Sequence, residues 1–261
     1  MKLYIFLFGL KRNGTHAIGE WIMGHWAESY PELYEHPQQY RVYINDVGKK
    51  YGLDFPPPLK LSWDKKHSDA DAPFRIMSYE SVRHQFLMGH RIEGEGRFVF
   101  LTVLRDAYNF LASFMEEWPH TSPPINRWVD SARFFYIGNV IDYFPINYNK
   151  WFIDQEYRRT ISRHIRPELN GGAEFSDIGL NRVRMVGSSF DKRAYDRNAQ
   201  EMKVLNRWKQ FQEEHKTRPL YRKYLQYFLE YSELSEYTKE IFGMDMPEPI
   251  VEDLRAVACC G

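Results

Sequence analysis

The sequence predicts an α/β fold with a central, mostly parallel sheet of about five strands flanked by helices. Apolar runs of strand length occur at 3–8 and 97–104, and each leads through a short loop into a segment with helical spacing. The run RFVFLTVL at 97–104 is apolar on both faces, as a central parallel strand requires. The chain of 261 residues is long enough for one sizeable core, so we expect a single domain over 1–261.

The composition limits the partners of this domain. Lys plus Arg equal Asp plus Glu at 35 each, so no net charge would recruit nucleic acid or an anionic membrane. The two cysteines, Cys259 and Cys260, are adjacent, and no disulfide framework or zinc site follows from them. No apolar run approaches the ~18–20 residues of a membrane span. We therefore expect a cytoplasmic protein without nucleic-acid or membrane partners, in which any anion site is built locally.

The first strand, at 3–8, ends at Gly9 in a short basic loop, and helical spacing begins after Gly14. A buried strand that feeds a helix N-terminus directs backbone N–H groups and the positive end of the helix dipole at one point, which suits an anion. The spacing of the two glycines imitates a Walker A loop. However, Thr15 and His16 stand where a P-loop NTPase carries Lys and then Ser or Thr. The loop predicts an anion site without the lysine of a kinase.

The next two strands are predicted at 40–47, which alternates, and at 74–79, which is followed by a helix from about 80 to 89. Residues 48–73 between them carry three consecutive prolines and read as a long loop insertion around the site. Both are counted among the strands of the predicted sheet.

The fourth strand, at 97–104, ends at Arg105, and a helix is predicted from Ala107 to Glu117. In open α/β sheets ligands bind beyond the carboxyl ends of the strands, so Arg105 is expected on the same rim as Arg12. Ser113 lies eight residues after Arg105, on nearly the same helical face, and Asp106 is placed to cap the helix.

The remaining chain is predicted as an alternation of loops and helices. A Pro-rich loop insertion covers 115–127, and helical spacing continues from Trp128 to about Tyr143. An apolar, strand-like segment at 143–151 precedes a helix at 154–165, a turn-rich insertion at 167–187 and a closing helix pair at 220–242 that would pack on the sheet.

Two segments resemble the PAPS-dependent sulfotransferases. The first loop is similar to their 5′-phosphosulfate loop, K/R-S/T-G-T-T/S, and the matching positions are Arg12, Asn13, Gly14, Thr15 and His16. The segment LTVLRDAYNFLASF resembles the family's strand followed by R-D/N-P-x-D/N-x-x-x-S, in which the arginine and the serine bind the 3′-phosphate of PAPS. Those positions are Arg105 and Ser113, and Ala107 replaces the proline.

Two later segments continue this resemblance. YFPINYNKW resembles a short family strand that ends Y-E-D-L, with Tyr148 as the tyrosine that reaches the adenine, although Asn149 and Lys150 replace the acidic pair. VGSSFDKR resembles the family's T-S-F-D segment, in which a hydroxyl residue and a phenylalanine contact the adenine, here Ser188 and Phe190. An aromatic ring and a hydroxyl suit a flat heterocycle.

A fifth segment, NRWKQF, resembles the basic stretch with which family members hold the 3′-phosphate through a mobile loop. Arg207 is the choice here, with Lys203 and Lys209 as competitors. The five segments occur in family order between Leu3 and Phe211.

The resemblance implies a sulfotransferase fold of the P-loop NTPase-like type. The family transfers the sulfuryl group of PAPS in line to a hydroxyl or amine and releases adenosine 3′,5′-bisphosphate. Arg12 and the loop N–H groups would stabilise the charge that grows on the bridging oxygen. Aromatic and acidic residues in the predicted pocket loops favour a ring-bearing or cationic small alcohol as acceptor. The acidic ones are Asp46, Asp69, Asp71, Glu116 and Glu117.

The general base is not defined by the resemblance. Cytosolic members place a histidine at the end of the third strand in K-T-H, but MSYES has Met77 at the lysine and Tyr79 at the histidine. Other branches use a glutamate, so Glu80 is our choice. The alternatives are His84, Asp46 and His16.

Two other functions stay open on the sequence. A P-loop small-molecule kinase would need a lysine after Gly14 and magnesium ligands. A non-catalytic nucleotide-binding protein would use the loop as scaffold alone.

Overall fold

The computed structural model describes residues 2–26, 41–45, 74–80, 96–137, 143–167 and 203–258, with the backbone alone for 41–45. The strands are β1 (Leu3–Gly9), β2 (Arg41–Asn45), β3 (Phe74–Glu80), β4 (Arg97–Leu104) and β5 (Tyr143–Asn147). The first helices are α1 (Thr15–Gly24), α4 (Ala107–Glu117), α5 (Ile125–Ile137), α6 (Tyr148–Ile153) and α7 (Gln155–Ile165). The C-terminal region holds η7 (Val204–Asn206), α9 (Arg207–His215), α10 (Pro219–Glu230), α11 (Glu233–Phe242) and α12 (Glu248–Ala258).

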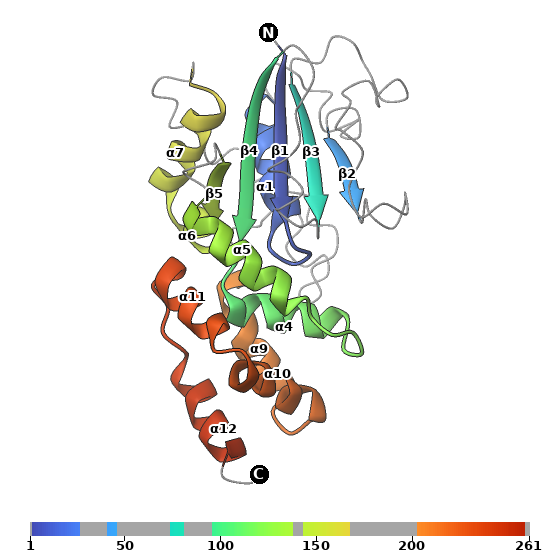
Figure 1. The fold of residues 1–261 in the computed structure, drawn as a ribbon, viewed down its shortest axis with the longest axis vertical. Helices are drawn as coiled ribbons and strands as arrows, with labels where there is room; N and C mark the ends of the chain where they lie inside the picture. Colours follow the sequence, from blue (N-terminus) through green and yellow to red (C-terminus); the bar gives the residue numbers. More distant parts are fainter. Residues whose placement is uncertain are drawn as a thin grey trace.

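The strands form one parallel sheet in the order β2-β3-β1-β4-β5 (Figure 1). β1 is central, and its last residue, Gly9, lies opposite Glu80 of β3, while Phe8 lies opposite Thr102 of β4. The predicted α/β class with a parallel sheet flanked by helices is confirmed.

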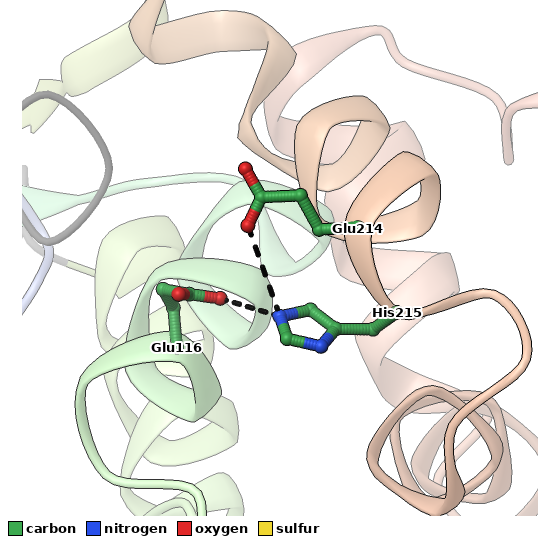
Figure 2. A group of neighbouring side chains, drawn as sticks. All are labelled: Glu116, Glu214 and His215. Carbon is green, nitrogen blue, oxygen red and sulfur yellow. Dashed lines mark hydrogen bonds and ion pairs between the residues drawn. The ribbon is translucent and has the colours of Figure 1, made fainter.

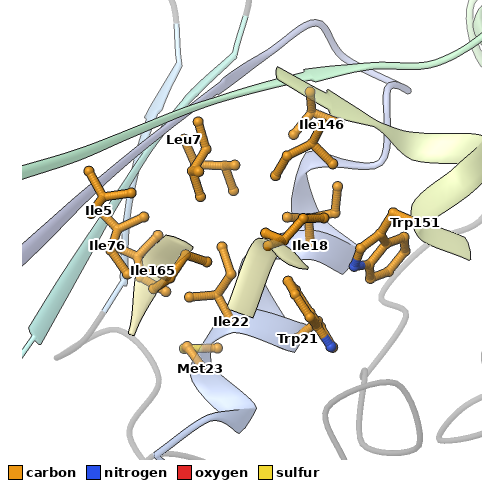
Figure 3. Packing of buried hydrophobic residues seen from close by; sticks show 14 of the residues in the cluster. Ile5, Leu7, Ile18, Trp21, Ile22, Met23, Ile76, Ile146, Trp151 and Ile165 are labelled. Carbon is orange, nitrogen blue, oxygen red and sulfur yellow. The ribbon is translucent and has the colours of Figure 1, made fainter. Parts of the chain in front are cut away.

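One face of the sheet packs against α1, α6 and α7 (Figure 3). Ile18, Trp21 and Ile22 of α1 recur at a spacing of three and four residues, so they line one side of the helix and meet Ile5 and Leu7 of β1. Each large apolar side chain buried in this way contributes about 1.5–3 kcal/mol to folding. This layer fixes the direction in which α1 leaves the first loop.

The opposite face of the sheet is aromatic. Phe6 stacks on Phe100 of β4 with ring centroids 4.9 Å apart, and Phe8 stacks on Tyr79 of β3 at 5.0 Å. Phe134 of α5 meets Tyr143 of β5 edge-on at 5.2 Å. Offset and edge-on pairs of this kind add to the hydrophobic term.

A second helical layer lies beyond the carboxyl edge of the sheet, where the strand arrows point in Figure 1. It joins α4 and α5 to α9, α10, α11 and α12 around Trp128, Phe211 and Tyr224. The closing pair was expected at 220–242 on the sheet; α10 and α11 do form there, but their buried side chains belong to this layer. Helix α12 was not predicted.

Three predicted boundaries are wrong. The loop insertion expected at 115–127 shortens to 118–124, since Phe114 and Met115 are buried and keep α4 helical. The next helix, expected to run to about Tyr143, is α5, and Tyr143 starts β5. The strand expected at 143–151 ends at Asn147, whose side chain caps α6 by accepting from the Lys150 N–H at 2.9 Å.

The helices of the described part of the chain were also compared with the length of a bilayer crossing. In the ranges given above, none is both long enough and apolar enough to span a membrane.

Candidate functional site: an arginine cluster at the carboxyl edge of the sheet

The candidate site lies where the chain reverses its direction of travel across the sheet. β1 leads to β2 on one side, whereas its neighbour β4 leads to β5 on the other. In open α/β sheets ligands bind at such a point, beyond the carboxyl ends of the two strands. The loop after β1 and the turn after β4, which carry Arg12 and Arg105, meet here, since the Arg105 Nη1 donates to the Arg12 carbonyl at 3.4 Å. Both arginines therefore lie on one rim, as predicted.

The loop after β1 has a constrained backbone. Arg12 has φ 74° and Gly14 has φ 88°, both in the left-handed region. A Cβ on Gly14 would lie 2.0 Å from Cε2 of Tyr148, so only glycine fits against that ring. The Asn13 N–H donates to the Leu10 carbonyl at 3.1 Å, and its side chain donates to the Val103 carbonyl of β4 at 3.2 Å. The loop is thereby attached to the adjacent strand.

The helix that follows this loop begins without a side-chain cap at Gly14 in the structure. The first N–H groups of a helix have no acceptor within the helix, and the helix dipole adds positive potential at the same end. The backbone at Gly14, Thr15 and His16 therefore contributes to an electropositive rim.

Arg105 is buried, with 5% of its surface exposed, and its guanidinium is held from three directions. Nη1 donates to Oγ of Ser113 at 3.1 Å, so the pairing predicted from the spacing of eight residues is present. Nη2 donates to the Val204 carbonyl. The guanidinium also lies over the Tyr148 ring, 5.5 Å from its centroid. These contacts fix the cation at the end of β4.

Arg207 enters the same cluster from the first residue of α9. It is 2% exposed, whereas the competing residues Lys203 and Lys209 are exposed. Its N–H donates to Oδ1 of Asn109 at 2.7 Å, and its Nη1 donates to Gln210 at 3.0 Å. Of the three basic candidates in this stretch, Arg207 is the one built into the site.

Asp106 organises the elements that carry these arginines. Its carboxylate caps α4 by accepting from the Asn109 N–H at 2.9 Å, as predicted, and also accepts from the Asn109 and Asn149 side-chain amides. Because Asn109 in turn accepts from Arg207, one carboxylate links α4, α6 and α9. Asn109 was not singled out from the sequence, although it fills the second D/N position of the R-D/N-P-x-D/N motif.

The electrostatics of the cluster favour a bound anion. Burial lowers the pKa of Arg105, and the positive charge of Arg12 lowers it further. Burial lowers the pKa of Arg207 to about 10, and repulsion from Arg105 and Arg12 adds to the shift. Burial raises the pKa of Tyr148, whereas the two neighbouring arginines lower it. Cations that repel one another in a low-dielectric site gain most from a bound anion.

The Arg12 side chain contacts two residues at the C-terminal end of α4. Its Nη2 lies 2.5 Å from Oε2 of Glu117, and its guanidinium lies over the Trp118 ring at 5.1 Å from the centroid. Burial lowers the pKa of Arg12, whereas Glu117 and Glu80 raise it. Neither Glu117 as an ion-pair partner nor Trp118 as a stacking partner was predicted, and no sequence pattern marks them.

The base candidates Glu80 and His16 meet at the same rim. Glu80 ends β3, and its Oε1 lies 2.9 Å from Nε2 of His16 in the first turn of α1. The alternatives His84 and Asp46 lie outside the described residues, as do Ser188, Phe190 and the insertion at 48–73. All of the insertion at 167–187 except Pro167 lies outside them too. Tyr148, predicted to reach an adenine, is buried between Gly14 and Arg105.

A second cluster of titratable side chains lies between α4 and α9 (Figure 2). It consists of Glu116, Glu214 and His215, and in the described ranges it is the one cluster with the spacing of a metal site. His215 Nε2 lies 2.8 Å from Glu116, and its Nδ1 lies 3.3 Å from Nη1 of Arg218. Arginine only donates, so Nδ1 accepts and Nε2 carries the hydrogen that Glu116 receives. In the structure the imidazole thus lies between a carboxylate and a guanidinium, and this group joins the C-terminal ends of α4 and α9.

The fold and the site define an α/β protein whose parallel sheet carries a cluster of three arginines and a helix N-terminus at its carboxyl edge. Comparisons with protein-family models, with curated proteins and with solved structures gave no match. The function is therefore inferred from the geometry of the site.

Proposed function

We propose that the protein is a PAPS-dependent sulfotransferase with the corresponding P-loop-like fold. It would transfer the sulfuryl group of PAPS to a hydroxyl or amine of a small molecule and release adenosine 3′,5′-bisphosphate. The observation that carries the proposal is the convergence of Arg12, Arg105 and Arg207 on one rim of the sheet. The resemblance assigns these separate stretches of sequence to the two phosphates of one nucleotide.

In this proposal, the loop after β1 binds the 5′ end of the nucleotide. As the bond between sulfur and the bridging oxygen breaks, negative charge grows on that oxygen. Arg12 and the N–H groups of Gly14, Thr15 and His16 at the start of α1 would stabilise this charge more in the transition state than in the ground state. One such donor typically supplies ~2.7–4 kcal/mol.

The turn after β4 supports the 3′-phosphate. Arg105 and Ser113 form a hydrogen-bonded pair, and the positive charge of Arg207 lies close enough to Arg105 for the two to repel each other. Guanidinium groups bind phosphate oxygens through two parallel hydrogen bonds, which suits a terminal phosphate. The adenine contacts remain assigned to Tyr148, Ser188 and Phe190 by the resemblance alone.

The acceptor belongs to the same proposal as a ring-bearing or cationic small alcohol. In the structure Glu117 pairs with Arg12, and Glu116 pairs with His215, so both carboxylates are used within the protein. The preference for a cationic acceptor therefore depends on Asp46, Asp69 and Asp71, which lie outside the described residues.

The runner-up functions differ from the proposal in the nucleotide bound and in the reaction. A kinase would bind ATP with magnesium, but Thr15 follows Gly14 where a kinase carries its lysine. A non-catalytic binding protein would bind the bisphosphate without transferring sulfate.

Calorimetric titration with adenosine 3′,5′-bisphosphate, in parallel with ATP and magnesium, tests the proposal. We expect the bisphosphate to bind and Arg105→Gln to weaken it by about 10- to 100-fold, since a charge-assisted hydrogen bond contributes about 1.5–3 kcal/mol. Arg163→Gln on the exposed side of α7 is the matched control and should bind like the parent chain. Tighter binding of ATP with magnesium would contradict the proposal. So would a failure of [35S]PAPS to transfer sulfate to any of a panel of phenols, alcohols and amines.

A further inference from the structure

His16 and Glu80 form a pair whose two members differ sharply in exposure. Glu80 ends β3 opposite Gly9, and its side chain is 7% exposed. His16 is the second residue of α1, and its side chain is 59% exposed. The carboxylate is thus covered, while the imidazole faces outward beside the loop that carries Arg12.

The pair defines which nitrogen of His16 holds the hydrogen. An ionised carboxylate only accepts hydrogen bonds, so the 2.9 Å contact places the hydrogen on Nε2 of His16. Nδ1 then carries the lone pair that accepts a proton. Arg12 of the same loop also interacts electrostatically with Glu80, which raises the Arg12 pKa, so Glu80 faces a guanidinium as well as the imidazole.

We infer that His16 is the general base for the sulfuryl acceptor and that Glu80 is the positioning residue that holds its tautomer and ring orientation. This inference rests on the proposed function and reassigns the role that the sequence suggested for Glu80. With 59% of its side chain exposed, the imidazole is accessible to a small acceptor, whereas the carboxylate, at 7%, is covered.

The acceptor hydroxyl oxygen forms a bond to sulfur while its proton passes to Nδ1 of His16. The bond between sulfur and the bridging oxygen breaks, and its electron pair stays on the 5′-phosphate of the released bisphosphate. The imidazolium, stabilised by the Glu80 carboxylate, then returns its proton to solvent. Base catalysis by a positioned side chain typically contributes about 10²–10⁴-fold.

The test compares three acceptors that need a base to different degrees. Benzyl alcohol is not ionised at working pH and 4-nitrophenol is largely ionised, while water serves as an acceptor through hydrolysis of [35S]PAPS. We expect His16→Gln, which retains a hydrogen-bond partner for Glu80, to slow transfer to benzyl alcohol or water about 100-fold or more and to slow 4-nitrophenol far less. Glu80→Gln should move the pH–rate profile of kcat, and Glu80→Asp should restore part of the rate.

Controls separate this inference from the proposed function and from misfolding. Affinity for adenosine 3′,5′-bisphosphate and the thermal midpoint should remain near parental values in His16→Gln and in the two Glu80 variants. His164→Gln, at an exposed histidine near the opposite edge of the sheet, should keep the parental rate and profile. If the parent chain transfers sulfate but His16→Gln keeps its rates and profile with every acceptor, His16 is a surface ion-pair partner and the inference fails alone. If the parent chain neither binds the bisphosphate nor consumes PAPS, the proposed function fails with it.

Discussion

Arg12 is where the residue-scale chemistry of the site is concentrated. Its left-handed backbone turns the loop, its carbonyl accepts from Arg105, and its guanidinium is held by Glu117 and Trp118. The Glu117 carboxylate forms an ion pair with Arg12, the residue to which we assign the 5′ end of the nucleotide. An anionic ligand must therefore compete with Glu117.

This competition gives a prediction for Glu117→Gln. Loss of the carboxylate should raise affinity for adenosine 3′,5′-bisphosphate by about two- to fivefold, because a partly exposed ion pair contributes about 0.2–1 kcal/mol. Calorimetric titration measures the change, and Glu156→Gln, which removes a similar pair with Arg159 on α7, is the control. Weaker binding by Glu117→Gln would show that the carboxylate helps to hold the ligand.

Gly14 gives a second residue-scale prediction. Gly14→Ala meets both a positive φ and the Tyr148 ring, whereas Gly243→Ala meets a positive φ of 64° with nothing within 4 Å. The backbone term alone costs about 1–2 kcal/mol, so Gly243→Ala should lose that amount and Gly14→Ala clearly more. Denaturant unfolding of the two variants measures the difference. Equal losses would mean that Tyr148 moves away without cost.

At the scale of elements, the predicted and observed structures agree where local signals are strong. β1, β4 and α4 appear at the expected residues because both faces of the strands are apolar and Asp106 caps the helix. The prediction missed the change at Asn147, because an apolar run does not distinguish a strand from a buried helix. It also could not place Glu117 or Trp118 on Arg12, because contacts between distant segments depend on how α4 packs beyond the sheet.

Asp106 provides a prediction at this scale. Asp106→Asn places an amide against the donors of Asn109 and Asn149, so part of the buried network loses its acceptor. We expect a loss of about 1–3 kcal/mol in the free energy of unfolding. Asp154→Asn, at the half-buried cap of α7, bonds a single N–H of Tyr157 and should cost little, since Asn caps about as well as Asp. Comparable losses in both variants would contradict a special role for Asp106.

For the whole molecule, the buried His25 couples stability to pH. It bonds the Trp21 and Ile22 carbonyls and Ser162 of α7, and burial lowers its pKa to about 4 from 6.5. Between these two pKa values, His25 binds a proton in the unfolded chain but not in the folded chain. The contribution of neutral His25 to the free energy of unfolding is therefore complete above pH 6.5 and is lost as the pH falls toward 4. The loss is on the order of 3 kcal/mol.

Denaturant unfolding at a series of pH values checks this prediction. His25→Asn removes the titrating group, so its stability should fall less steeply than that of the parent chain between pH 6.5 and about 4. His120→Asn, at an exposed histidine of the 118–124 loop, should keep the parental slope. Parallel slopes for the parent chain and His25→Asn would assign the acid sensitivity to other groups.

The bridging of α4, α6 and α9 by the Asp106 carboxylate has a consequence for how a ligand is received. The segments that carry Arg105, Tyr148 and Arg207 are held together by contacts within the protein. These three segments therefore lose their conformational entropy when the protein folds and not when a ligand binds. Binding at this end of the site should be fast and need little rearrangement.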